Sequence, residues 1–172
     1  MRSLVVYESS FGNTQRIAAK IAAALAPEGK VALRSVDEAC PPLDNVDLLV
    51  VGGPTHIHGV SSERSRQGAL DQGASGEVGI GVRGWIDALP NGARGPRVAA
   101  FDTRAHKPAL LVGSAASGIS RRLRQHGYAL ATEPESFFVE GTSGPLEEGE
   151  LERAWEWGRT LANEASRTAV MI

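Results

Sequence analysis

The chain has 172 residues, of which 18 are lysine or arginine and 20 are aspartate or glutamate, so its net charge is −2. This length suits one domain, residues 1–172, with a core that needs no disulfide or metal, and the charge gives no sign of a nucleic-acid-binding surface. No apolar run reaches the roughly 18 residues that a membrane span needs. The single cysteine and the N-terminal segment MRSLVVYESS, which does not resemble a signal peptide, predict a cytoplasmic protein.

The N-terminal third of the chain predicts strands and a helix in alternation. Short apolar runs rich in β-branched residues predict three strands, at residues 3–8, 30–36 and 47–53. Residues 14–26 carry Ile17, Ile21 and Leu25 at helical spacing and predict a helix that ends at Pro27. The third strand, DLLVVGG, is apolar on both faces, which indicates a position inside a parallel sheet covered by helices.

Residues 59–81 are rich in Ser, Arg, Gly and Gln and show no periodicity. They predict a long loop, and long loops in compact domains usually serve a function. Further along, the chain predicts strands 97–103 and 136–140 and helices 82–89, 114–126 and 146–166. The apolar stripe of the last helix consists of Leu151, Ala154, Trp155, Gly158, Leu161 and Ala165. We therefore expect Trp155 in the core and Trp157 at the edge of the stripe.

Strands that alternate with helices predict an α/β fold, a doubly wound five-stranded parallel sheet with helices on both faces. In such a sheet, ligands bind beyond the carboxyl ends of the strands, at the point where the strand order reverses. The loops after the first, third and fourth strands are SSFGNT, GPTHIHG and DTRAHKP. If these strands are neighbours, the three loops converge on one crevice.

The segment SSFGNT, residues 9–14, leaves the first strand and opens the first helix. Gly12 allows a close backbone approach with positive φ, and Asn13 or Thr14 can cap the helix, whose N–H groups and dipole favour an anion. The segment has no lysine or arginine, so neutral donors would hold a phosphate here. An ordinary capped turn would use the same residues, and the spacing alone leaves both interpretations open.

SSFGNT resembles the phosphate loop of flavodoxins, in which Ser or Thr is followed by a variable residue, an aromatic residue or Thr, and Gly-Asn-Thr. It also follows the first strand, as in that family. The strand that runs into GGPTHIHG and the strand RVAAFDT resemble the strands that lead into the two flavin loops. The resemblance implies a flavodoxin-like sheet of order 2-1-3-4-5 and a non-covalently bound FMN.

The resemblance also implies the residues that hold the cofactor. The phosphate would be held by the backbone N–H of Phe11 together with Ser9, Ser10, Gly12, Asn13 and Thr14. The ribityl chain and the flavin ring would be bordered by Pro54, Thr55, His56, Ile57, His58 and Gly59. The other edge of the ring would be bordered by Asp102, Thr103 and Arg104. We expect no metal site, because His56 and His58 have no third ligand with supporting spacing.

Two features differ from typical flavodoxins. Neither THIHG nor DTRAHKP supplies a Tyr or Trp to stack on the flavin, so a histidine either stacks there or stays a solvated loop side chain. The predicted rim is also basic and contains His56, His58, Arg64, Arg66, Arg104, His106 and Lys107. Cations stabilise the anionic reduced flavin, so two-electron reduction should be easier here than in acidic flavodoxins.

Three functions remain open. The favoured one is an FMN-binding electron carrier that exchanges electrons with a redox partner protein or an NAD(P)H-linked reductase. The second is an FMN-dependent NAD(P)H:quinone-type reductase, in which residues 59–81 form a lid, a cofactor site or a contact between copies of the chain. The third is a flavodoxin-like module that has lost flavin and serves in protein interaction or regulation. The sequence has no Gly-Lys-Ser/Thr phosphate loop and no Gly-x-Ser-x-Gly elbow, which argues against NTP hydrolysis and serine hydrolase chemistry.

Overall fold

The computed structural model describes residues 1–39, 43–56, 59–60, 67, 80–108, 113–141 and 144–169. The strands are β1 (Arg2–Tyr7), β2 (Lys30–Ser35), β3 (Leu48–His56), β4 (Gly59–Val60), β5 (Arg97–Ala105) and β6 (Glu135–Val139). The helices are α1 (Asn13–Leu25), α3 (Val82–Asp87), α5 (Ala115–Gln125) and α6 (Glu150–Ala169), with a 3-10 turn, η1 (Ala26–Glu28), after α1. No helix in these residues is long and apolar enough to cross a membrane.

Five strands run parallel in the order β2-β1-β3-β5-β6. The predicted order is confirmed, since β5 and β6 are the fourth and fifth strands of the prediction. The two-residue strand β4 was not predicted, and it pairs antiparallel with the end of β3. The chain moves from β1 to β2 on one side and later returns to β3 on the other, so the order reverses at the β1–β3 pair.

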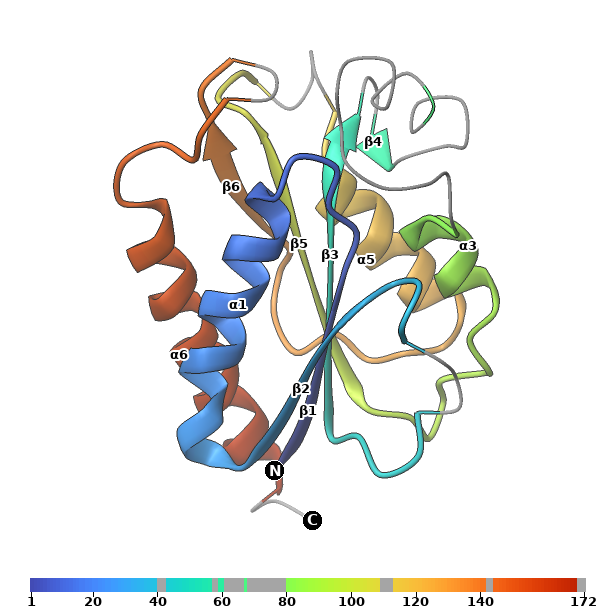
Figure 1. Cartoon of the computed structure of the whole chain (residues 1–172). Helices are drawn as coiled ribbons and strands as arrows, with labels where there is room; N and C mark the ends of the chain where they lie inside the picture. The colour runs from blue at the N-terminus through green and yellow to red at the C-terminus, as the bar shows by residue number, and fades with distance from the viewer. Residues whose placement is uncertain are drawn as a thin grey trace.

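Helices cover both faces of the sheet, with α1 and α6 on one face and α3 and α5 on the other (Figure 1). Successive residues of a strand point to opposite faces, so Val5 lies in the α1–α6 core and Val6 in the α3–α5 core. Residues 48–51 of β3 are fully buried and alternate between the same two cores. This double burial explains why the continuous apolar run DLLVVGG forms a central strand.

Both β3 and β5 extend further than the sequence predicted. Pairing between them continues to Pro54 opposite Thr103, and pairing of β5 with β6 continues to Ala105 opposite Val139. The neighbouring strand supplies hydrogen-bonding partners beyond the apolar run, and hydrophobic periodicity cannot detect this pairing. Residues expected in two loops therefore lie at the ends of strands, where the sheet holds them in register.

The tryptophans of α6 lie opposite to the prediction, which was wrong for both. Trp155 is 38% exposed, whereas Trp157 is 9% exposed and its ring centroid lies 6.2 Å from that of Phe101 and 6.1 Å from that of Phe137. The buried apolar side chains among the described residues of the helix are Ala154, Trp157, Leu161 and Ala162. These positions share one face of the helix, whereas Trp155, the residue next to Ala154, lies about 100° away around the helix axis.

Candidate functional site

The loop that leaves β1 forms a turn around Gly12, the residue that precedes α1. Gly12 has φ 84°, a left-handed conformation in which a side chain would be strained. The hydroxyl oxygen of Ser9 accepts hydrogen bonds from the backbone N–H of Gly12 (3.1 Å) and of Gln15 (3.3 Å). The prediction that Asn13 or Thr14 caps α1 is therefore wrong, because Ser9 Oγ takes that role from outside the helix.

Asn13 and Thr14 do not cap α1, and their side chains form hydrogen bonds with other parts of the protein. The Asn13 side-chain amide donates to the backbone oxygen of Gly144, at 2.7 Å, in the segment between β6 and α6. The Thr14 hydroxyl lies 2.7 Å from the hydroxyl of Thr103 on β5, and Thr14 is only 1% exposed. The cradle, which we define as residues 9–14, is thus fixed by contacts to distant segments as well as by its own turn.

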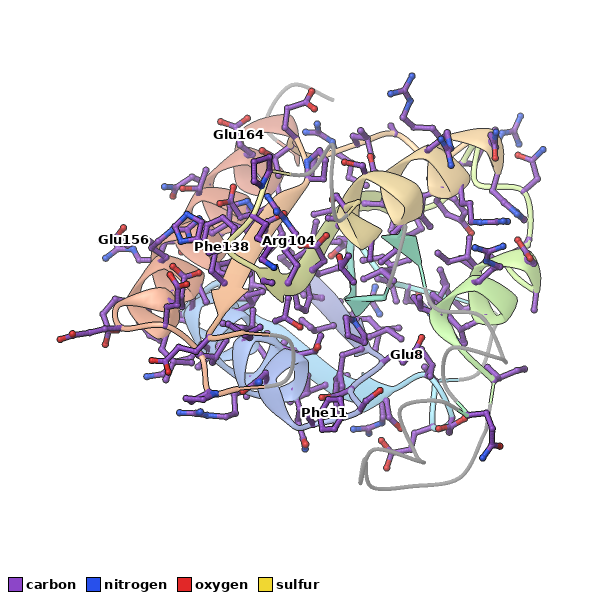
Figure 2. All side chains as sticks on the ribbon, turned by 90° about the horizontal axis from the view of Figure 1, so that it is seen from above. Glu8, Phe11, Arg104, Phe138, Glu156 and Glu164 are labelled. Atoms are coloured by element: carbon purple, nitrogen blue, oxygen red, sulfur yellow. The ribbon has the colours of Figure 1, made fainter. Side chains whose placement is uncertain are left out.

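The start of α1 is suited to an anion. The first N–H groups of an α-helix have no acceptor within the helix, and the dipole is positive at this end. The first turn contains no acidic residue. Ser9 and Ser10 are half-buried, whereas Phe11 is 41% exposed. Figure 2, which looks down on the carboxyl ends of the strands, shows Phe11 beside the start of α1.

A buried carboxyl group, that of Asp102 on β5, joins β3, β5 and α5 at the same edge of the sheet. Asp102 is fully buried, and its Oδ2 accepts from the hydroxyls of Thr55 and Ser114 and from the backbone N–H of Ala116, each at 2.9 Å. The backbone N–H of Ala115 in turn donates to Thr55 Oγ1. The other carboxyl oxygen of Asp102, Oδ1, has no partner among the described residues. Asp102 therefore fixes the start of α5, where the helix dipole favours a negative charge.

A second carboxyl group, on Glu8, follows β1 directly and was not singled out from the sequence. Glu8 is 7% exposed, and its carboxylate accepts from the backbone N–H of Val82, at 2.8 Å, where α3 begins. Figure 2 shows Glu8 on the α3 side of the site. The preceding residue, Tyr7, has its pKa raised by burial and further by the nearby charge of Glu38. Both causes favour the neutral form of the phenol.

An aromatic stack lies beside the third predicted loop. His106 packs on Phe138 of β6 with ring centroids 4.1 Å apart and an angle of 8° between planes, and its Nδ1 lies 3.0 Å from Glu147 Oε2. The guanidinium carbon of Arg104 lies 5.1 Å from the Phe138 centroid, and Figure 2 shows the two side chains together. Phe138 was missed because it lies in a strand, although SFFVE places two adjacent phenylalanines on opposite faces of an edge strand.

The structure brings together the residues that the resemblance selected from β1, β3 and β5. Pro54 and Thr55 are half-buried at the end of β3, next to Asp102 and Thr103, which are 0% and 5% exposed. His56 ends β3 and Gly59 begins β4, whereas Ile57 and His58 lie outside the described residues. Among the residues that are described, no group of three His, Cys, Asp or Glu side chains could hold a metal ion.

Comparison with known proteins supports a flavodoxin-like fold. Residues 4–66 match the profile of the flavodoxin domain family, whereas no curated protein sequence matches the chain. A flavodoxin from the domain Archaea is similar over 96% of this chain and 99% of its own, with 18% identity and a TM-score of 0.66. Oxidised flavodoxin 2 from Bacillus cereus covers 95% and 99%, with 21% identity and a TM-score of 0.66.

A third solved structure, two-electron reduced flavodoxin from Megasphaera elsdenii, is similar over 94% of this chain and 98% of its own. Its identity is 17% and its TM-score 0.56. At these identities the solved structures establish the fold, and the profile match adds the sequence pattern of β1, α1, β2 and β3. The chain therefore has a flavodoxin-like fold, and its first third carries a sequence match to the flavodoxin domain.

Proposed function

We propose that this protein binds FMN non-covalently and carries electrons through it. The observation that carries the proposal is the cradle at residues 9–14, at the end of β1 and at the point where the strand order reverses. Its donors are hydroxyls and helix N–H groups, without a lysine or arginine. Such a site suits a lone phosphate monoester, which neutral donors can surround, better than a magnesium-bound triphosphate.

The residues at hand fit FMN at its phosphate end. Ser9, Ser10 and Thr14 would offer hydroxyls, and Phe11 and Asn13 would offer backbone N–H groups. The N–H of Gly12 donates to Ser9 Oγ, so Gly12 would contribute a close approach of the backbone to the phosphate. Pro54 to Gly59 would border the ribityl chain and ring, with Asp102, Thr103 and Arg104 at the other edge. When bound, FMN supplies one-electron and two-electron redox chemistry. The chain's own part is to bind and orient the cofactor and to surround it with fixed charges.

A second candidate is an FMN-dependent NAD(P)H:quinone-type reductase. It is favoured by the cations at the third loop, where Arg104 is half-buried and Lys107 exposed. These cations would favour the anionic reduced flavin and an anionic dinucleotide. The carboxyl groups of Glu8 and Asp102 at the same edge would act in the opposite direction wherever they are ionised. A redox titration of the FMN-loaded protein measures whether the cations or the carboxyl groups dominate the potential. The electron carrier remains our first proposal.

Titration of the purified protein with FMN and with riboflavin tests the proposal. We expect saturable quenching of flavin fluorescence, with FMN bound at least tenfold more tightly than riboflavin because only FMN has the phosphate. The double variant Ser9→Ala/Thr14→Val should lose most of this preference. Ser117→Ala/Thr160→Val is the matched control, because both residues are exposed and lie on α5 and α6.

Two results would reject parts of the proposal. No flavin binding by the wild-type protein would favour the third hypothesis, a module without flavin. Unchanged FMN affinity in the double variant would reject the cradle as the phosphate site. If FMN binds, steady-state oxidation of NADPH with a quinone separates the reductase from the carrier, since a carrier alone gives no turnover without its partner.

A further inference from the structure

Two hydroxyl groups, those of Thr14 in α1 and Thr103 in β5, meet beneath the cradle. They are 89 positions apart in the chain, and their oxygens lie 2.7 Å from each other. Thr14 is 1% exposed and Thr103 is 5% exposed, so bulk water does not reach the pair. The pair joins the first turn of α1 to the strand whose end was expected at the edge of the flavin ring.

The pair has one more hydrogen than it can use. Each hydroxyl carries one hydrogen, and the single bond between the two oxygens uses only one of them. No other hydrogen bond to either hydroxyl occurs within the described residues. A buried donor without an acceptor lowers stability, which makes an acceptor from outside the protein favourable at this point.

The direction of the bond decides where the second hydrogen lies. If Thr14 donates, the spare hydrogen belongs to Thr103, within the interface between β5 and α1. If Thr103 donates, the spare hydrogen belongs to Thr14, in the first turn of α1, where the helix N–H groups also need an acceptor. An anion at the helix start favours the second arrangement, because it can accept from Thr14 and from the N–H groups together.

We propose that Thr103 is a positioning residue for phosphate binding: its hydroxyl donates to Thr14 and directs the Thr14 hydroxyl hydrogen toward the phosphate of the cofactor. This inference rests on the proposed function of the cradle. It gives Thr103 a role at the phosphate end, exerted through Thr14, which the sequence did not indicate. The hydrogen bond from Asn13 to Gly144 O also fixes the first turn of α1, so the cradle can hold Thr14 in one orientation.

The test compares Thr103→Val, which keeps the shape and loses the hydroxyl, with Thr103→Ser, which keeps the hydroxyl. Thr103→Val should weaken FMN binding roughly tenfold and leave riboflavin binding within about twofold, because riboflavin has no phosphate. Thr103→Ser should restore FMN affinity to within about threefold of wild type. Thr160→Val is the control, since that hydroxyl bonds only to Glu156 O on the surface of α6.

Equal weakening of FMN and riboflavin by Thr103→Val would show a general structural role and overturn the inference, and so would unchanged FMN affinity. A second measurement, the shift in melting temperature caused by inorganic phosphate, does not depend on flavin. If the wild-type protein binds phosphate but not FMN, the proposed cofactor is rejected. In that case, loss of the phosphate-induced shift in melting temperature in Thr103→Val would still support the positioning role. A wild-type protein that binds neither would overturn both.

Discussion

At the phosphate end of the candidate site, Ser9 closes its own turn and Asn13 and Thr14 are hydrogen-bonded to distant segments, whereas His106 and Lys107 at the third loop lie exposed. The first region is preorganised, so its geometry does not depend on a ligand. In the second region, the buried carboxyl group of Asp102 supports a rim whose side chains are exposed to solvent. If the cradle holds a phosphate as proposed, its recognition is built into the fold, and the exposed rim is where the redox potential and the partner would be set.

Removing the support beneath the rim should give the largest effect. Asp102→Ala leaves the hydroxyls of Thr55 and Ser114 and the N–H of Ala116 without their acceptor, so we expect a loss of about 3 kcal/mol in the free energy of unfolding. Urea denaturation measures it. Asp102→Asn keeps one acceptor oxygen and should lose less.

The matched control for this change is Asp87→Ala, which removes an exposed ion pair with Arg122 and should cost less than about 1 kcal/mol. The FMN-over-riboflavin preference of Asp102→Ala should survive, because the cradle lies on the other face of the sheet. A loss of that preference would mean that the two regions are one cooperative unit. A stability equal to wild type would mean that water replaces the carboxylate.

The turn of the cradle should be the next most sensitive feature. Gly12→Ala puts a side chain at φ 84°, where open space surrounds the added atom but the backbone is strained, so we expect a loss of about 1–2 kcal/mol. FMN affinity should fall as the loop relaxes, with riboflavin affinity unchanged. Gly84→Ala, within α3 and without a close contact, is the control and should be neutral or stabilising. An unchanged FMN affinity in Gly12→Ala would show that the cradle tolerates another conformation.

Much of this architecture could be predicted from the sequence, because parallel central strands such as β3 are long apolar runs and α1 carries a regular apolar stripe. The ends of strands were less predictable, since the pairing of Pro54 with Thr103 depends on a neighbour that sequence periodicity does not describe. Trp155 was misplaced for a related reason: a stripe of Ala and Gly does not fix the centre of the buried face.

The candidate site was predictable only where it is local. Spacing indicated a turn at residues 9–14, and the resemblance favoured a phosphate cradle there, but the partners of Asn13 and Thr14 lie in segments 131 and 89 residues away. Only the fold brings Gly144 and Thr103 to them. Phe138 and Glu8 were missed in the same way, because each lies in or directly after a strand and acts through a contact with a distant segment.

Asn13→Ala should have a smaller effect than Gly12→Ala. It removes one hydrogen bond to Gly144 O, worth about 1 kcal/mol, and leaves the backbone N–H groups of the cradle in place. We expect FMN binding to weaken about fivefold by fluorescence titration, since the tie to the segment after β6 is lost. Gln15→Ala, an exposed neighbour on α1, is the control. Equal weakening in the control would assign the effect to helix stability instead of the tie.

His106→Ala should have the smallest effect. The His106 side chain is 64% exposed, its contact with Glu147 is a surface ion pair only when the imidazole is protonated, and such pairs contribute little to stability. The stack on Phe138 adds a modest further term, so the free energy of unfolding should fall by less than about 1 kcal/mol. FMN and riboflavin affinities should both stay within about twofold of wild type if the open rim does not hold the ring. Equal tenfold losses of both flavins would place the ring against the His106–Phe138 stack and show that the third loop is as preorganised as the cradle.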